Sequence, residues 1–315
     1  MSSQPGYLVG IIAVVIAAVL WGTTGTAATF APQVSPLGIA SVTMGVGGLL
    51  LALVAAKPIV RHKTALINNR LLVIAAALNV AIYPLAFYSS MKLSGIAVGN
   101  VISIGLAPIA AALIEWTFDK QSLNRRWLIS IAFGVTGVVF LATAKPASSF
   151  ENTATSWHNS VGILLGLVAA FTYAMYSWIA RRLIDRGIAS RAAMGSMFGL
   201  GALLLMPVLF VTGAPLLASV NNFSVGLYLA VVPMFLAYLL FGRGLTVVRA
   251  SLATTITLLE PVVAALLAVT VVGEKLSLTG WFGIGLISAC LLIATLRKPV
   301  KNRTKPIYEV SETST

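Results

Sequence analysis

The sequence predicts an all-α integral membrane protein with ten transmembrane helices arranged as two inverted five-helix repeats. Three observations lead to this fold class. Of the 315 residues, 58% are hydrophobic and 9% are charged, and the mean hydropathy is +0.97, whereas soluble domains carry about 25% charged residues. The apolar runs are too many and too long for one soluble core. Short motifs of the first half also recur in the second half at a nearly constant distance.

Ten apolar runs separated by short polar links define the predicted spans. A membrane helix needs about 20 predominantly apolar residues, and the fifth and tenth runs are near the lower limit of that length. The links are short, so we expect no extramembrane domain. The first run lacks a basic leader and is long enough to remain as a span, so no cleavable signal peptide is expected. The runs are 8–30, 35–56, 71–91, 95–117, 127–144, 160–180, 190–212, 225–242, 250–272 and 280–296.

The positive charges lie on one side of these spans. With the N-terminus in the cytoplasm, the inside links and the tail hold 18 of the 21 lysines and arginines, and the outside links hold Lys92, Lys145 and Lys275. Cytoplasmic loops of membrane proteins are enriched in Lys and Arg, so we expect both termini in the cytoplasm. This topology accounts for most of the formal charge of +13, and no nucleic-acid partner is expected.

The two halves of the chain resemble each other. Pro108 recurs as Pro261 and Lys120 recurs as Lys275, and the offset of all matches stays between 152 and 155. Five spans in each half is an odd number, so the two copies must be inverted in the membrane. Inverted repeats with prolines in paired helices indicate a transporter with a site near the bilayer midplane. The expected domains are a first repeat at 1–150, a second, inverted repeat at 151–298 and a disordered cytoplasmic tail at 299–315.

One acid, Glu260, lies in the middle of the ninth run, directly before Pro261. A charged residue at the helix centre costs about 2.5–3.5 kcal/mol on insertion scales and is a functional candidate by default. Pro261 has no N–H, and its ring displaces the carbonyl group of Thr257. Lipid cannot solvate such a break, so we expect it to face protein or a wet cavity. Glu260 is predicted to bind a proton or a substrate amine; the alternative is an acid satisfied by Thr257 and the backbone.

Four prolines are predicted to break their spans, two of them at equivalent positions of the two halves. A proline in a helix removes one hydrogen bond and frees a carbonyl group. Hinges and static kinks both remain open as interpretations. These prolines are Pro84, Pro108, Pro233 and Pro261.

Polar and aromatic side chains recur three or four positions apart inside the runs, so each pair shares one helix face. We predict that they bind the substrate; the alternative is interhelical hydrogen bonding, worth about 0.6 kcal/mol per contact. Glu115, near the inner end of the fourth span, is instead expected to pair with Arg125 or Arg126. The predicted substrate-binding residues are Trp21, Thr24, Asn79, Tyr83, Asn100, Ser103, Tyr173, Tyr176, Tyr238, Thr257 and Glu260.

Three Gly-x-x-x-Gly motifs allow close approach of helices. Packing within one chain is the expected role, and a homodimer seam remains open. The motifs begin at Gly95, Gly162 and Gly195.

Several of these motifs together resemble a known family. Pro261 is followed by Val-Val-Ala-Ala-Leu and then by Gly-Glu274-Lys275-Leu-Ser, and the first half has Trp21-Gly and, after Pro108, Asp-Lys. In this order, with the duplication and ten spans, they resemble EamA-type members of the drug/metabolite transporter superfamily over about residues 7–296. For Glu274 and Lys275, capping of a helix end is the expected role.

The resemblance implies a ten-helix inverted-repeat carrier whose central cavity is lined mainly by spans 1, 3, 4, 6, 8 and 9. It also implies export of small metabolites, often amino acids, or of toxic analogues. The usual hosts of the family favour a bacterial inner membrane. A secondary carrier of amino acids or related amines is therefore the leading functional prediction.

Other functions remain as alternatives. A carrier of organic phosphates or nucleotide sugars would need basic residues deep in the cavity, and none lies at mid-span. A passive channel or an assembly subunit stays open. No Walker-type stretch exists, so ATP does not power the chain, while coupling to protons, exchange and a downhill gradient all stay open. Cys290 is the only cysteine, and His62 and His158 lie far apart, so we expect no metal, no cofactor and no enzymatic activity.

Overall fold

The computed structural model describes residues 4–94, 99–121, 124–143, 156–273 and 276–295, and every regular element within them is helical. The motif residues Glu274 and Lys275, Gly95, most of the link 145–159 and the predicted tail 299–315 lie outside the described residues.

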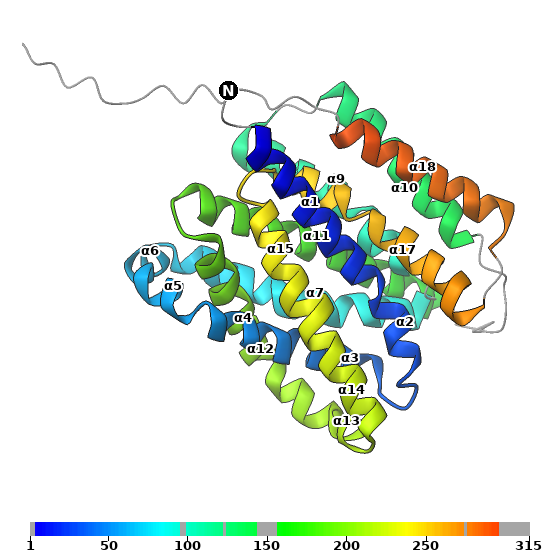
Figure 1. The fold of residues 1–315 in the computed structure, drawn as a ribbon, viewed down its shortest axis with the longest axis horizontal. Helices are drawn as coiled ribbons and strands as arrows, with labels where there is room; N and C mark the ends of the chain where they lie inside the picture. Colours follow the sequence, from blue (N-terminus) through cyan, green and yellow to red (C-terminus); the bar gives the residue numbers. More distant parts are fainter. Residues whose placement is uncertain (1–3, 95–98, 122–123, 144–155, 274–275, 296–315) are drawn as a thin grey trace, which may run out of the picture.

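In the first half, most predicted spans consist of consecutive helical segments, and π-helical segments are labelled η (Figure 1). The third span is one continuous helix, and the link 57–70 forms two short helices. The elements are α1 (Gln4–Gly22), α2 (Thr24–Thr29), α3 (Pro36–Ser41), η1 (Val42–Val46), α4 (Gly47–Val54), α5 (Ala56–Arg61), α6 (Lys63–Asn68), α7 (Arg70–Ser94), η2 (Val101–Gly105), α9 (Ala107–Asp119) and α10 (Arg125–Thr143).

In the second half, the sixth and seventh spans are single helices, whereas the eighth and ninth consist of consecutive segments. The elements are α11 (Ser156–Asp185), α12 (Ser190–Thr212), α13 (Ala214–Leu217), α14 (Val220–Leu229), η3 (Ala230–Leu236), α15 (Ala237–Gly244), α16 (Ala250–Ile256), α17 (Leu259–Leu267), η4 (Ala268–Val272) and α18 (Leu278–Thr295).

The prolines differ in what they do to the backbone. Helical structure stops at Leu106, two residues before Pro108, and at Thr257 and Leu258, just before Pro261. Pro233 lies inside the π-helical segment η3. At Pro84 the expected break is absent, because α7 continues through it. A single missing N–H does not end a helix whose other turns are held by packing against neighbouring helices.

Contacts between helices are paired as an internal twofold relation requires. When each span is exchanged with its counterpart in the other half, the contact of α7 with α11 becomes the contact of α15 with α1. The contact of α9 with α11 becomes that of α17 with α1 in the same way. The pairs α4–α12 and α10–α18 map onto themselves. The last pair lies side by side at one edge of the molecule (Figure 1).

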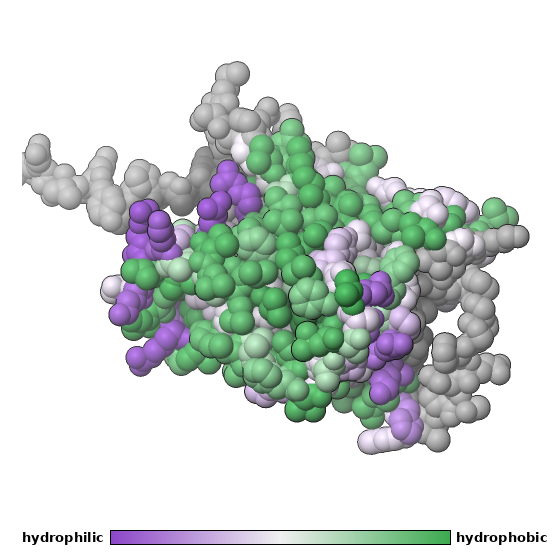
Figure 2. All heavy atoms as spheres, turned by 60° about the horizontal axis from the view of Figure 1, so that its bottom comes forward, coloured by the Kyte–Doolittle hydropathy of each residue, from purple (hydrophilic) through white to green (hydrophobic). Residues whose placement is uncertain are grey.

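The surface is that of a membrane protein. Within the described residues, nine helical stretches are long and apolar enough to cross a membrane. The segment of the predicted fifth span, α10, is a helix of 19 residues that packs along α18 but is not among the nine. Large apolar side chains face outward, and Phe210 is 82% exposed. Figure 2 shows a broad hydrophobic surface with hydrophilic residues at opposite edges of the view, as a bilayer requires.

The glycine motifs pack within the chain. Gly162 and Gly166 of α11 lie against α7 and η2, and Gly195 and Gly199 of α12 lie against α4. A side chain at any of these four positions would come within 3.0 Å of a neighbouring atom. The motifs therefore serve close packing of helices in the monomer, and a homodimer remains a prediction.

We expect Gly283→Ala to destabilise the fold and Gly285→Ala, on the same helix α18, to leave it unchanged. A methyl group at 283 would lie 2.7 Å from the Gly137 carbonyl oxygen of α10, whereas nothing lies within 4 Å of one at 285. Overpacking of this kind costs about 1–3 kcal/mol. Thermal unfolding in detergent measures the difference, and equal melting temperatures would contradict the close approach of α10 and α18.

Candidate functional site

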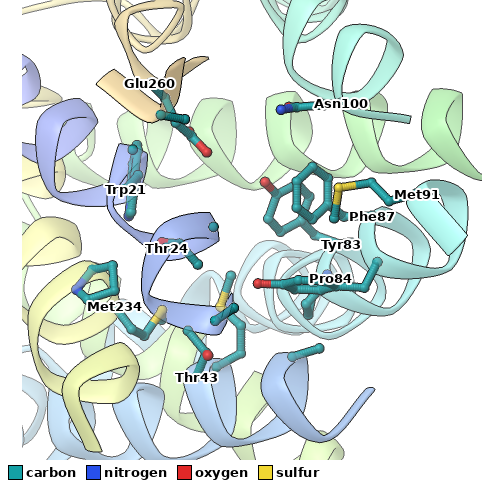
Figure 3. Close-up of a pocket in the computed structure, with 18 of the residues that line it drawn as sticks. Trp21, Thr24, Thr43, Tyr83, Pro84, Phe87, Met91, Asn100, Met234 and Glu260 are labelled. Carbon is teal, nitrogen blue, oxygen red and sulfur yellow. The ribbon is translucent and has the colours of Figure 1, made fainter. Parts of the chain in front are cut away.

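A cavity of about 200 Å³ lies where the two halves meet (Figure 3). The first half contributes α1, α2, α3, η1, α7 and the residue before η2, and the second half contributes α11, η3, α15 and α17. Ala28 near the end of α2, Met91 near the end of α7 and Asn100 before η2 all line it. The cavity therefore lies toward the C-terminal ends of α2 and α7.

Aromatic rings form much of the cavity wall. The ring centroids of Trp21 and Tyr238 are 4.8 Å apart, and those of Tyr83 and Tyr173 are 5.5 Å apart. These pairs join α1 to α15 and α7 to α11, which are equivalent contacts under the twofold relation. Tilted aromatic pairs at such distances add to the stability that burial provides.

Hydroxyl groups behind the rings hold the wall in place. Thr257 donates to the Thr254 carbonyl oxygen at 2.9 Å, so its oxygen accepts from the Tyr173 hydroxyl at 3.0 Å. The hydroxyls of Tyr176 and Tyr238 are 2.8 Å apart. The side chain of Thr257 is thus used at the helix break and does not satisfy Glu260.

Glu260 is the second residue of α17, and its backbone N–H donates to the Thr257 carbonyl oxygen at 2.9 Å. The carboxyl group points into the cavity (Figure 3). No hydrogen-bond donor or cation contacts it among the residues that the structure describes. The N-terminal end of a helix favours negative charge, so the position tolerates a carboxylate while leaving it free for a ligand.

Two other polar atoms of the cavity wall are also unpartnered. Trp21 Nε1 and Asn100 Oδ1 are buried and have no hydrogen bond to the described protein, and both residues line the cavity. Buried polar groups nearly always have a partner, so such atoms call for one. A donor on one wall and an acceptor on another are groups that a ligand or water can satisfy.

The structure brings seven of the eleven predicted substrate-binding residues to this cavity. They are Trp21, Thr24, Tyr83, Asn100, Tyr173, Tyr238 and Glu260. Pro84, Pro233 and Pro261 also line it. Their roles in binding or as hinges remain predictions.

The other four residues, and Pro108, do not line the cavity. Asn79 donates to the Ala75 carbonyl oxygen of its own helix at 2.7 Å. Ser103 is fully buried. Tyr176 and Thr257 lie behind Tyr238 and Tyr173 as their hydrogen-bond partners. Pro108 is buried at the start of α9.

Sequence reasoning missed the contribution of the second span. Thr43 and Met44 of η1 line the cavity, as does Tyr88 of α7. Tyr88 follows Tyr83 by five positions, so a rule of three or four positions does not find it. Thr43 is a polar residue inside an apolar run, which is the signal that the sequence offered.

Polar contacts between the halves join the opposite ends of the same helices. Asp119 of α9 accepts from Trp178 Nε1 of α11 at 2.6 Å and pairs with Arg182. Glu115 accepts from the backbone N–H of Ser251 at 3.1 Å and from its hydroxyl at 2.6 Å. The prediction that Glu115 pairs with Arg125 or Arg126 is therefore wrong. The start of α16 lies closer and offers donors that need a partner.

The helices are tightly packed between these contacts and the cavity. Ser251 and Glu260 are nine residues apart, which corresponds to about 13 Å along a helix. Between them Ala253, Thr254 and Ile256 are fully buried, as are Ala107 and Ala111 on α9. The cavity is thus separated from this end of the molecule.

A helical membrane fold whose two halves meet at a cavity is typical of transporters of small molecules. Comparison with known proteins agrees. The sequence pattern of the EamA-like transporter family matches residues 8–143 and 160–296. The chain therefore belongs to the EamA-like transporter family.

Several relatives span nearly the whole chain. The uncharacterized transporter YwfM of Bacillus subtilis is 33% identical over 301 residues, which cover 95% of this chain and 97% of the relative. The uncharacterized inner membrane transporter YicL of Salmonella typhimurium is 25% identical and covers 91% and 95%. Protein PecM of Dickeya dadantii is 25% identical and covers 87% and 88%.

A solved crystal structure shares the fold. It superposes with a TM-score of 0.76 over 94% of this chain and 98% of that chain, at 19% sequence identity. At this identity the similarity shows the fold alone.

We expect a cysteine in place of Thr24 to react with a bulky maleimide in detergent solution much faster than a cysteine in place of Ser103. Thr24 lines the cavity and is half-buried, whereas Ser103 is fully buried outside it. The one native cysteine, Cys290, is buried and adds little background. Mass spectrometry gives the labelled fraction with time, and equal rates would contradict the position of the cavity.

Proposed function

We propose that this transporter exports small amine-bearing metabolites, such as amino acids, amines or toxic analogues, across a bacterial inner membrane by alternating access. The observation that carries the proposal is the unpartnered carboxyl group of Glu260 in an aromatic cavity at the junction of the halves. A carboxylate in such a place attracts a cationic amine or a proton, and aromatic faces add cation–π attraction.

The two kinds of occupant suggest how transport is driven. A protonated Glu260 is neutral, so it no longer attracts an amine, and a bound amine in turn displaces the proton. If only the loaded forms cross between the two orientations, proton entry and amine exit become an exchange. In this proposal, an open cavity and a tightly packed opposite end correspond to one of those two orientations.

The orientation in the membrane rests on the charges. The ends of α9 and α11 that hold Asp119 and Arg182 belong to the side rich in Lys and Arg, which we assign to the cytoplasm together with both termini. The cavity then lies toward the outside, and the packed end lies toward the cytoplasm. The relative YicL is named as an inner membrane transporter, which supports this location.

The cavity does not favour the other candidate functions. A carrier of organic phosphates needs basic groups near its ligand, and the described residues that line this cavity include no lysine, arginine or histidine. A passive channel needs a continuous path, whereas the residues between the cavity and the inner contacts are fully buried.

We expect Glu260→Gln to fold and insert but to lose pH-dependent transport, because the amide cannot exchange a proton. Proteoliposomes measure exchange of labelled L-phenylalanine or 2-phenylethylamine across a range of pH, with protein-free vesicles subtracted. Glu115→Gln is the matched control, since that acid lies outside the cavity, and it should keep its pH dependence. An unchanged pH dependence in Glu260→Gln would contradict the proton role.

A further inference from the structure

The cavity contains a charge of only one sign. Glu260 is the acidic residue in its described lining, and no basic side chain is present there to balance it. We propose that the ligand is an organic cation, a primary amine on an aromatic or apolar body, without a carboxylate of its own. This inference rests on the proposed function and narrows its substrate class from amino acids to amines.

The charge of the cavity argues against a zwitterion. An amino acid that places its ammonium group at Glu260 must bury its carboxylate in the same cavity of about 200 Å³. That carboxylate meets no cation among the described lining residues and is repelled by Glu260. An uncompensated buried charge costs several kcal/mol, and the single N–H of Trp21 is a neutral donor.

The unpartnered atoms argue for a primary amine. Asn100 Oδ1 is a buried acceptor without a donor among the described residues. The side chains of Asn100 and Glu260 both point into the cavity, with the amide nitrogen of Asn100 drawn toward it (Figure 3), so the amide group must turn to offer its oxygen to a ligand. An ammonium group has three N–H donors and can serve an amide oxygen and a carboxylate together. A quaternary ammonium group has none and would leave Asn100 Oδ1 unsatisfied.

The remaining unpartnered atom constrains the body of the ligand. Trp21 Nε1 needs an acceptor, and a neutral hydroxyl or carbonyl oxygen on the ligand provides one without adding charge. The side chains of Trp21, Tyr83 and Tyr238 line the same space. They can hold an aromatic ring, or attract the ammonium group itself. An aromatic amino alcohol therefore supplies a partner to Glu260, Asn100 Oδ1 and Trp21 Nε1.

A matched set of compounds tests each part of this inference. L-phenylalaninol differs from L-phenylalanine in a hydroxymethyl group that replaces the carboxylate, and 2-phenylethylamine differs from its N,N,N-trimethyl derivative in its N–H groups. Ligand-induced thermal stabilisation in detergent reports the affinities. We expect L-phenylalaninol to bind at least about tenfold more tightly than L-phenylalanine, because the buried carboxylate is uncompensated. We also expect 2-phenylethylamine to bind more tightly than the trimethyl compound.

Two variants connect these preferences to the residues. Glu260→Gln should remove the preference for L-phenylalaninol over L-phenylalanine. Asn100→Ala should reduce the preference for the primary over the trimethyl amine and leave the first preference intact. Asn79→Ala is the control, because that asparagine bonds to its own helix outside the cavity, and it should change neither preference. Gel filtration and the melting temperature without ligand establish that each variant is folded.

The outcomes separate this inference from the proposed function. Equal or tighter binding of L-phenylalanine, or binding of none of the compounds, overturns the inference. Counterflow of the same compounds in proteoliposomes is measured in parallel. Amines that bind but show no counterflow refute transport and leave the ligand class standing. Equal counterflow of L-phenylalanine and L-phenylalaninol refutes the ligand class and leaves transport standing.

Discussion

The rest of the structure depends on one constraint: the hydrocarbon core of a bilayer offers no hydrogen bonds, so every polar group at that depth must be satisfied by protein or enclosed water. The helix break at Thr257 and Leu258 meets it through Tyr173, whose hydroxyl donates to Thr257. The start of α16 meets it through Glu115. Glu260, Trp21 Nε1 and Asn100 Oδ1 are exceptions that lie at the cavity, and Ser103 Oγ is a further buried atom without a partner that lies outside it. At the cavity, a ligand is the natural partner of the unsatisfied groups.

The site uses an approximate twofold symmetry and then departs from it. Pro108 and Pro261 are equivalent, yet the residue before the first is Ala107, fully buried, and the residue before the second is Glu260. The two halves supply the same scaffold, but only the second supplies the acid. The contact between Arg182 and Asp119, at the end of the helices opposite to the cavity, can open easily, since the two side chains are 35% and 28% exposed. Ion pairs of that kind contribute about 0–1 kcal/mol, so separating them costs little.

The sequence predicted the fold well because lipid and chain topology act directly on composition. Apolar runs predict the spans, the steady offset between matches such as Pro108 and Pro261 predicts the duplication, and the odd number of spans in each half predicts the inversion. Glu260 was identifiable because an acid inside an apolar run is costly to insert and is therefore rare without a function. Which of the predicted residues reach the cavity depends on the tertiary structure, which the sequence pattern does not contain. Asn79 and Tyr83 share a helix face, but only Tyr83 reaches the cavity, since α7 is long and the cavity lies near one end. Glu115 contacts a helix start instead of two arginines nearer in sequence.

The central claim is that the cavity and the inner contacts open and close in opposition. Spin labels at Phe30 and Lys92, which flank the cavity-lining residues Ala28 and Met91, report the outer end. Labels at Gln121 and Arg186, which border the contacts of Asp119 and Arg182, report the inner end. Pulsed electron–electron double resonance in liposomes is measured with and without L-phenylalaninol across a range of pH. The distance between one pair of labels should lengthen as the distance between the other pair shortens. Distances that stay fixed, or that change in the same direction, would contradict the account.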